Sequence, residues 1–538
     1  MTTGTDRIRQ GRIGIAALIV GAGILVSRLL GVVREQIFAA LLGADGVTDV
    51  YVASFRIPDY ANYLLAGGFL TITFIPIFSR YLERDEETEG WQAFTIVTRW
   101  LAVGIVALIA IGWVLAPWVI GWLYPDFTSE QIDATVRLTR IVIPAQFAFV
   151  VGAMFVAVQY AKGHFAIPTL APVIYNVSII AGGVLYAVLT GTPDPEGFVW
   201  GALIGAFLGN LVVQVWGARR VGMRIIGGPW LHPAVKEYAL LAFPLMLGQS
   251  IVAFDEVFMS VFGAMTGEGG QTHLQYARRT MLVPVGLIAQ AAGVAAFPFL
   301  ARLFAAGEIG KMQRTVDRAL KYVLASSIGA AGLLAALSMP VVRTLFERRA
   351  FDERDSVAVA AALFFYAFAI PVWGGLQILT RAFYARRDMW TPVLVGTAVT
   401  VVAVPMYFLM EGWFGIEGVA VASVLSLGAY SVALAALWYR GRSGRARLRA
   451  VLETAGRAIP PTVVGAAAAF LVGWVIVENL PGPTTITNLL ASVAGGLTFI
   501  AVALGLSSVL YDLLRRRSTD QGASPGEDDE TTDVMEVL

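Results

Sequence analysis

Long apolar stretches separated by short polar segments run along nearly all of the 538 residues. A hydrocarbon core about 30 Å thick needs about 20 mostly apolar residues in a helix to cross it. The pattern predicts fourteen membrane-spanning helices, at roughly 13–42, 47–80, 92–123, 133–161, 168–190, 194–218, 235–264, 270–304, 315–346, 357–385, 390–411, 415–440, 456–478 and 484–514. The short alternating segments of a transmembrane barrel are not seen. We therefore expect an all-α polytopic membrane protein.

Composition narrows the class of function. Hydrophobic residues make up 57% of the chain and charged residues 14%, with a mean hydropathy of +0.71. Soluble domains carry about 25% charged residues. The net charge of +1 gives no reason to expect a nucleic-acid partner. Cysteine is absent and the three histidines are scattered, so we expect no disulfide, metal site, cofactor or catalytic centre.

Lysine and arginine concentrate in alternate loops. The loops on the same side as the amino-terminal segment 1–12 hold most of them, whereas the opposite loops hold only Arg348, Arg349 and Arg354. Positively charged loops face the cytoplasm. Both termini are therefore expected there. The polar, acidic segment 515–538 is predicted to be a disordered cytoplasmic tail.

Short motifs recur 222 to 224 residues apart. The matches are Tyr160-Ala-Lys162 with Tyr384-Ala-Arg386, and Pro76 and Arg80 with Pro298 and Arg302. The repeat predicts two lobes of six helices running in the same direction: a first lobe over 13–218 and a second lobe over 235–440. Parallel repeats of this kind are common among transporters. The two helices within 456–514 fall outside the repeat.

The first predicted span carries Arg28, Arg34 and Glu35. A charge at mid-bilayer depth costs about 2.5–3.5 kcal/mol on insertion scales, so such residues usually face a shared polar cavity. Arg28 and Glu35 are seven residues apart and share a helix face, while Arg34 lies elsewhere on the helix. These charges indicate an anion site. The alternative is that they lie near the membrane rim or pair structurally with Asp49.

The second and eighth spans add further charges. Asp49, Arg56 and Asp59 lie in the second span, and the repeat offset of 222 relates Arg56 to Arg278. Arg278 and Arg279 are adjacent, so only one of them is expected to point inward. Planar guanidinium groups bind phosphate oxygens in a bidentate manner. A phosphate or pyrophosphate group held between both lobes is the predicted ligand, and structural pairing with nearby acids is the alternative.

Asp255 and Glu256 form the main acidic pair of the second lobe. They are candidates for binding a cation or proton that drives transport, and equally for neutralising the arginines. Glu256 lies 222 residues after Arg34, which predicts that the two residues face each other across the lobes.

Several of these segments resemble the MurJ/MviN lipid II flippases. The matching runs are Ser27-Arg-Leu-Leu-Gly-Val-Val-Arg34-Glu, Thr48-Asp49, Phe55-Arg-Ile-Pro58, Phe74-Ile-Pro-Ile-Phe78, Gly163-His-Phe-Ala-Ile-Pro168, Tyr276-Ala-Arg-Arg279 with Pro284, and Phe383-Tyr-Ala-Arg-Arg-Asp388 with Thr391-Pro-Val393. They cover essentially residues 15–440.

The resemblance implies the multidrug/oligosaccharidyl-lipid/polysaccharide exporter fold. It implies export of lipid II, an undecaprenyl-pyrophosphate-linked disaccharide-pentapeptide, by alternating access. Arg28, Arg34, Asp49 and Arg279 are then implied as cavity residues, and segment 456–514 as a groove for the lipid tail. The implied partners are lipid II and membrane lipids, with cell-wall synthesis enzymes as further candidates.

The sequence departs from the family pattern at two places. Where the family often has paired arginines and a glutamate, this chain has Asn62, Tyr63 and Gly67, and Arg56 is the candidate substitute. The eleventh span lacks the Asn and Asp expected of a sodium site. The alternatives are a flippase for another polyprenyl-pyrophosphate-linked glycan and a multidrug exporter. A scaffold for cell-wall enzymes would have no need of intramembrane arginines.

Overall fold

The computed structural model describes residues 23, 25–65, 69–230, 232–480, 482 and 484–520. Across these residues the chain is helical, and the one β-bridge is an isolated antiparallel pair between Arg348 and Phe351. The all-α prediction is confirmed. Residues 1–12, the predicted amino-terminal segment, lie outside the described residues.

The first lobe begins with a helix over residues 25–42. It continues with α2 (Gly46–Ser54), α3 (Arg56–Leu65), α4 (Phe69–Glu83), α5 (Glu87–Leu123), α6 (Ser129–Val142), α7 (Ala145–Ala161), α8 (Leu170–Thr190), α9 (Pro195–Gly205), the π-helix η1 (Ala206–Val212) and α10 (Val213–Arg220).

The second lobe contains α11 (Pro233–Met265), α12 (Gly270–Val285), the π-helix η2 (Gly286–Gln290), α13 (Ala291–Ala305), α14 (Ile309–Ala336), α15 (Ser338–Leu345), α16 (Glu353–Ala367), α17 (Ala369–Ala385) and α18 (Trp390–Trp438). A basic helix α19 (Arg442–Arg457) then leads to α20 (Ile459–Asn479) and α21 (Thr484–Asp520).

Within the described ranges, eight helices are long and apolar enough to cross a membrane, or up to nine if the pair α16–α17, bent by 44°, is one span. Other predicted spans fall on broken runs such as α2–α4, so the total of fourteen stays a prediction. Predicted spans eleven and twelve are joined in α18 across Gly415, which has a φ of 55°. Helix α21 runs to Asp520, past the predicted start of the tail at 515, and residues 521–538 lie outside the description.

Local chemistry explains several helix boundaries. Asp45 and Asp352 accept hydrogen bonds from backbone N–H groups in the first turns of α2 and α16, and each forms a capping box. Such caps satisfy donors that have no partner inside the helix. Pro284 lies just before η2, where its missing N–H and its ring favour a break in the regular hydrogen-bond ladder.

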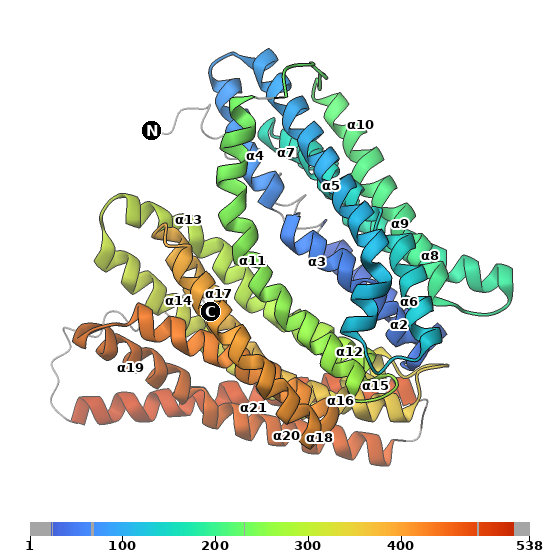
Figure 1. Ribbon diagram of the computed structural model, residues 1–538. Helices are drawn as coiled ribbons and strands as arrows, with labels where there is room; N and C mark the ends of the chain where they lie inside the picture. The colour runs from blue at the N-terminus through green and yellow to red at the C-terminus, as the bar shows by residue number, and fades with distance from the viewer. Residues whose placement is uncertain are drawn as a thin grey trace.

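The two lobes form a V in Figure 1. They meet where α2 approaches α12, a region we call the closed end, and they diverge toward the opposite, open end. Helix α11 packs against both α3 and α18, and so joins the lobes along its length. Helices α20 and α21 pack on each other and against α14 and α15.

The repeated motifs occupy equivalent positions in the two lobes. Arg80 lies in the last turn of α4, and Arg302 lies in the last turn of α13. Lys162 is the C-cap of α7, and Arg386 is the C-cap of α17. The equivalence supports the interpretation of the chain as a duplicated six-helix unit.

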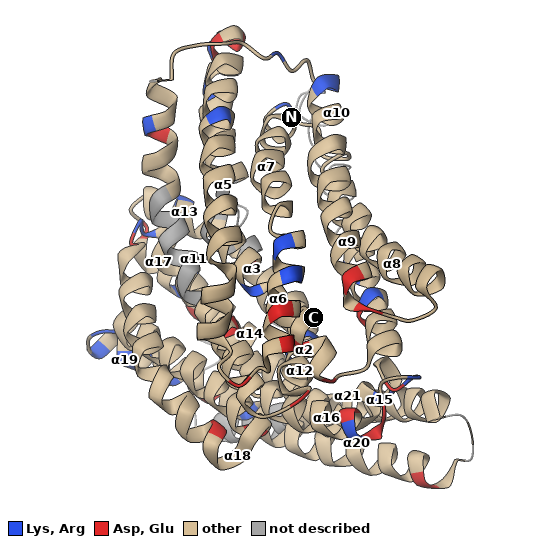
Figure 2. Ribbon diagram, turned by 45° about the vertical axis from the view of Figure 1, so that its right-hand side comes forward, with Lys and Arg blue, Asp and Glu red and all other residues tan. Residues whose placement is uncertain are grey.

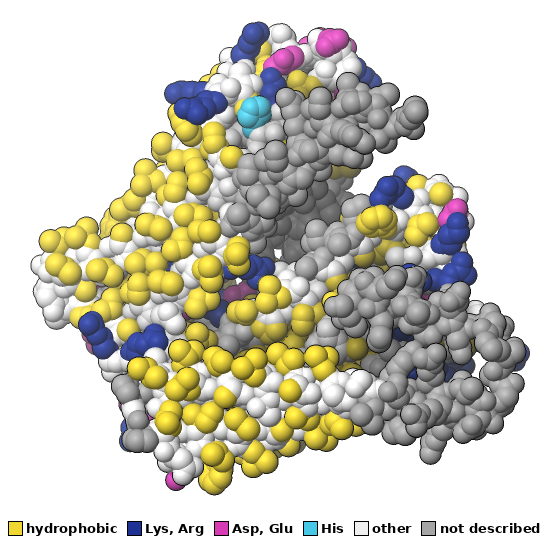
Figure 3. Space-filling view, turned by 180° about the vertical axis from the view of Figure 1, so that it is seen from behind, with side chains coloured by type: hydrophobic (Ala, Val, Ile, Leu, Met, Phe, Trp, Pro, Cys, Tyr) yellow, Lys and Arg dark blue, Asp and Glu magenta, His cyan; other side chains and the backbone are white. Residues whose placement is uncertain are grey.

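The surface is that of a membrane protein. Many large apolar side chains are exposed, including Trp118 at 72% and Leu189 at 75%. They form broad hydrophobic bands over both arms of the molecule (Figure 3). Long uncharged stretches are visible in α8 and α20 (Figure 2). Figure 3 also shows a notch between the arms, with charged side chains near its inner end.

Candidate functional site

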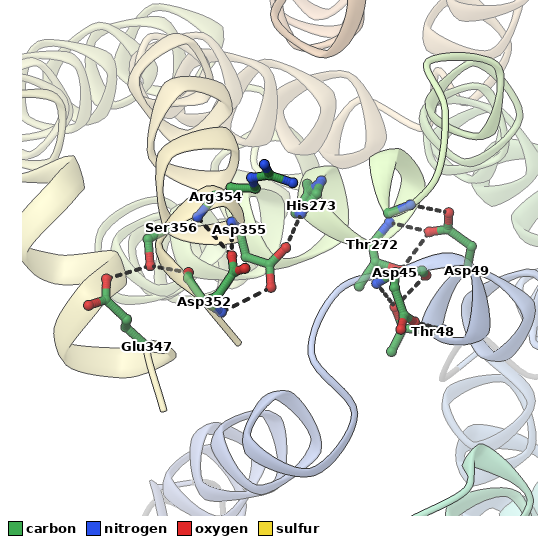
Figure 4. A network of polar contacts seen from close by, with 11 residues as sticks. Asp45, Thr48, Asp49, Thr272, His273, Glu347, Asp352, Arg354, Asp355 and Ser356 are labelled. Carbon is green, nitrogen blue, oxygen red and sulfur yellow. Dashed lines mark hydrogen bonds and ion pairs between the residues drawn. The ribbon is translucent and has the colours of Figure 1, made fainter. Parts of the chain in front are cut away.

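The closed end is held together by a polar network that crosses between the lobes (Figure 4). Asp49 of α2 is 2% exposed, and its Oδ2 accepts a hydrogen bond from the Gly269 N–H at 2.7 Å. Its Oδ1 accepts from the N–H of Thr272 at 2.9 Å and from the Thr272 hydroxyl at 2.7 Å. A carboxylate of the first lobe therefore caps the amino terminus of α12 in the second lobe, where negative charge is favoured.

A second part of Figure 4 lies within the second lobe. His273 of α12 lies 2.9 Å from Asp355 of α16, measured from Nε2 to Oδ1. Ser356 donates its hydroxyl proton to Glu347 at 2.7 Å. The His273–Asp355 contact holds the start of α16 against α12, and the Ser356–Glu347 hydrogen bond holds it against the residues after α15. Both contacts support the start of α12, where Asp49 accepts its hydrogen bonds.

Glu35 of the first helix bridges the lobes deeper in the molecule. Its Oε1 accepts a hydrogen bond from Arg34 Nη2 at 2.5 Å and forms an ion pair with Arg279 of α12. The Glu35 side chain is 11% exposed and that of Arg279 is 39% exposed. The ion pair therefore joins the first helix to α12 of the second lobe.

Arg56 of α3 makes a second ion pair between the lobes, in which the first lobe supplies the arginine and the second lobe the carboxylate. Its Nη1 lies 3.2 Å from Glu256 Oε1 of α11, and its Nη2 donates to Gln275 Oε1 of α12 at 2.6 Å. Arg56 is 4% exposed. The arginine proposed as a substitute at the departure from the family pattern thus reaches the second lobe. Asn62 is half-buried on α3, whereas Gly67 lies outside the described residues.

Arg278 pairs with Asp255 inside the second lobe, and both are almost fully buried. Asp255 Oδ1 also accepts hydrogen bonds from the hydroxyls of Tyr407 at 2.9 Å and Ser423 at 2.8 Å. These residues lie on either side of Gly415, whose positive φ is one that glycine adopts at little cost. The break in α18 therefore brings both of its halves onto one carboxylate.

We call the charged residues at the lobe interface, together with the adjoining pair Arg278–Asp255 inside the second lobe, the junction cluster, which comprises Arg34, Glu35, Arg56, Asp255, Glu256, Arg278 and Arg279. Each arginine in the cluster contacts a carboxylate. Removing one partner of a buried ion pair typically costs about 3–5 kcal/mol, because it leaves the other charge uncompensated. An incoming anion would either share these arginines with their carboxylates or displace the carboxylates.

Two predicted pairings differ in the structure. Arg34 contacts Glu35, not Glu256, because the neighbouring carboxylate on the same helix lies within reach. Asp49 is engaged by the start of α12 and not by an arginine of the first helix. The adjacent Arg278 and Arg279 point to different partners, Asp255 and Glu35, so both contact carboxylates, whereas only one of them was predicted to point inward.

The sequence analysis did not single out Arg381 of α17. Its Nη1 donates to the backbone carbonyl oxygen of Gln290 at 3.3 Å, and Arg28 Nη2 donates to the Gln290 side-chain oxygen at 3.2 Å. Arg28 therefore lies apart from the junction cluster and contacts the second lobe further along. The signal for Arg381 was available, since it is an arginine inside a predicted span.

Comparison with known proteins gives the same assignment from independent data. The family model described as "Lipid II flippase MurJ" matches residues 38–480. A probable lipid II flippase MurJ of Rhizobium tropici is 29% identical over 430 residues, which are 78% of this chain and 80% of the relative. One from Rhizobium meliloti is 27% identical over 518 residues, or 94% of this chain and 96% of the relative.

Solved structures share the fold. A lipid II flippase MurJ in an inward closed conformation superposes with a TM-score of 0.75 at 20% identity, covering 92% of this chain and 99% of that protein. A multidrug resistance MATE transporter of the MOP superfamily, in an inward-facing conformation, gives a TM-score of 0.65 at 15% identity, covering 82% and 99%. Because the family model covers most of the sequence, the chain belongs to the lipid II flippase MurJ family.

Proposed function

We propose that this protein moves lipid II from the cytoplasmic to the outer leaflet of the bacterial inner membrane, with both termini in the cytoplasm. The observation that carries the proposal is the junction cluster, in which arginines of both lobes meet inside a helical membrane protein of this family. Guanidinium groups suit a pyrophosphate, the charged link in this substrate.

The proposed cycle uses competition for the arginines. Because the lobes meet at the closed end, the substrate would approach the junction cluster from the open end. Pyrophosphate oxygens would replace Glu35 on Arg279, or Glu256 on Arg56, and so weaken a bond between the lobes. A ligand shifts a conformational equilibrium only through different affinity for the two states. When a phosphate replaces a carboxylate on one of these arginines, an ion pair between the lobes is lost, so the substrate would have different affinities for the two conformations.

The roles of α20 and α21 follow from their position outside the repeat. They pack along α14 and α15 through a cluster that includes Leu337, Ala469 and Phe499. Their outer faces are apolar and exposed, for example at Phe470 and Leu497. We propose that the long lipid tail lies against this pair of helices while the head group crosses.

The test is complementation of a bacterium depleted of its own flippase, with lipid II in each leaflet measured by labelling from outside. The wild-type chain should restore growth and outer-leaflet lipid II. The triple variant Arg34→Ala, Arg56→Ala and Arg279→Ala should insert in the membrane but restore neither. Arg318→Ala, an exposed arginine on α14, is the matched control.

Growth with all three arginines replaced would overturn the role of the cluster. Restored growth without movement of lipid II, together with movement of a different polyprenyl-linked glycan by the purified protein, would overturn the substrate.

A further inference from the structure

Two arginines from different lobes converge on one residue outside the junction cluster. Arg28 of the first helix and Arg381 of α17 both donate to Gln290, the last residue of η2, through its side-chain and backbone oxygens respectively. We call Arg28 and Arg381 the η2 pair. Gln290 is eleven residues beyond Arg279, or about 16 Å along the helical run at 1.5 Å per residue, toward the open end.

Glycines make room for both guanidinium groups. A Cβ atom at Gly286 would overlap the guanidinium of Arg28, and one at Gly293 would overlap that of Arg381. Gly286, Gln290 and Gly293 are spaced four and three residues apart, which puts them on one side of the helix. Both charged groups therefore pack directly on the backbone around a π-helical turn, a feature often found at functional sites.

The η2 pair differs from the junction cluster in its partners. Within the described part of the chain, neither Arg28 nor Arg381 forms an ion pair with a carboxylate. Their acceptor is a neutral amide, which offers far less compensation to an intramembrane cation. A purely structural contact between lobes would be better served by an acidic residue at position 290. Two guanidinium groups that share a neutral acceptor suit a ligand with several negatively charged oxygens.

We propose that the η2 pair is a capture subsite for the diphosphate of a polyprenyl-linked substrate, occupied before that group reaches the junction cluster. The proposal rests on the proposed function and names the first binding step. Phosphate oxygens take the place of Gln290 as acceptors, without displacing any carboxylate. Since one arginine comes from each lobe, the bound diphosphate bridges the lobes near the open end.

The test measures binding to the full-length protein in nanodiscs of neutral phospholipid. The probes are farnesyl diphosphate, inorganic pyrophosphate and phosphatidylglycerol. Arg381→Gln should raise the dissociation constant for farnesyl diphosphate about tenfold, the effect of losing one charge-assisted contact. Gly293→Ala should shift it in the same direction, because the methyl group displaces the flexible end of Arg381 while the charge remains. Arg318→Gln should leave it unchanged.

The probes separate the possible sources of the anion. Farnesyl diphosphate should bind more tightly than inorganic pyrophosphate, and pyrophosphate should compete with it. Equal binding of the two would overturn the assignment to a lipid-linked diphosphate, in favour of free phosphate. Equal competition by phosphatidylglycerol would overturn the selectivity for a diphosphate over an ordinary lipid head group.

Failure of this inference is distinct from failure of the proposed function. If wild-type protein flips lipid II but both Arg381→Gln and Gly293→Ala bind farnesyl diphosphate normally, the capture subsite is wrong and the flippase stands. If the wild-type protein moves no lipid II, the proposed function itself is wrong.

Discussion

The junction cluster and the η2 pair are both cationic and both join the lobes, but they are compensated differently. In the junction cluster, Arg279 faces Glu35 and Arg56 faces Glu256. In the η2 pair, Arg28 and Arg381 share the neutral Gln290. An anion at the junction therefore meets arginines that already contact carboxylates, whereas an anion at the η2 pair replaces only bonds to an amide.

This difference in compensation predicts two different roles: the η2 pair binds the substrate, whereas the junction cluster couples binding to a change of conformation. Binding at the η2 pair costs little reorganisation, so its main effect is affinity. Binding at the junction removes cross-lobe ion pairs, and part of the binding energy then changes the stability of one conformation relative to another. Removing a charge at the η2 pair should therefore change mainly affinity, whereas removing one at the junction should also change transport.

The largest effect is expected at Glu35. Glu35→Gln frees both Arg34 and Arg279 from their shared carboxylate. Binding of inorganic pyrophosphate should become about tenfold tighter, because it no longer competes with a carboxylate. Transport should nevertheless be lost, since ligand binding no longer breaks a bond between the lobes. Isothermal titration and the complementation assay together measure the two effects.

Arg279→Gln is the informative counterpart, because it should lose transport and also weaken pyrophosphate binding. Glu478→Gln, an exposed acid at the end of α20, is the control that should change neither. If Glu35→Gln weakened binding as Arg279→Gln does, competition between carboxylate and phosphate would be the wrong account of the junction.

A smaller effect is expected at the closed end. Asp49→Asn removes the charge at the start of α12 and turns one of two acceptor oxygens into a donor, so a buried N–H group loses its partner, which should cost about 1–2 kcal/mol. The lobes should separate more often at this end, with the equilibrium shifted about 5–30-fold. Since the chain has no cysteine, spin labels at Val47→Cys and Arg354→Cys can report the distance directly.

Asp45→Asn is the matched control, because Asp45 caps α2 within its own lobe and contacts no residue of α12 through its side chain. It should leave the distance distribution unchanged. Farnesyl diphosphate binding at the η2 pair should also be the same in Asp49→Asn, since the two places are at different depths. Equal distance changes in both variants would mean that the cap has no role in joining the lobes.

Much of the architecture could be predicted from the sequence. Apolar length and period give the helices, and span twelve is predicted to begin at Gly415, where α18 breaks. Because a charge inside the membrane is costly, Arg34, Arg56 and Arg279 could be identified as candidate site residues. The same rule would also have selected Arg381, which lies within the predicted span 357–385.

The pairing of these charges could not be predicted, because it depends on how the lobes dock. The repeat offset related Arg34 to Glu256, yet each residue has another partner. The repeat instead relates the two ion pairs that cross between the lobes. Glu35 of the first span pairs with Arg279 of the eighth, and Glu256 of the seventh span pairs with Arg56 of the second. Gln290 carries no charge, and only its position between two arginines marks it.

The smallest effect is expected at Tyr407, which supports the junction from inside one lobe. Tyr407→Phe removes one of the two hydroxyl donors to Asp255, while Ser423 and Arg278 remain in place. The loss should lower stability by about 1 kcal/mol in thermal unfolding. Transport and pyrophosphate binding should stay near wild type, because the bond does not cross between the lobes. A loss of transport as large as in Glu35→Gln would show that the contacts within the second lobe also rearrange during transport. The charges that transport requires would then not be only those that form ion pairs between the lobes.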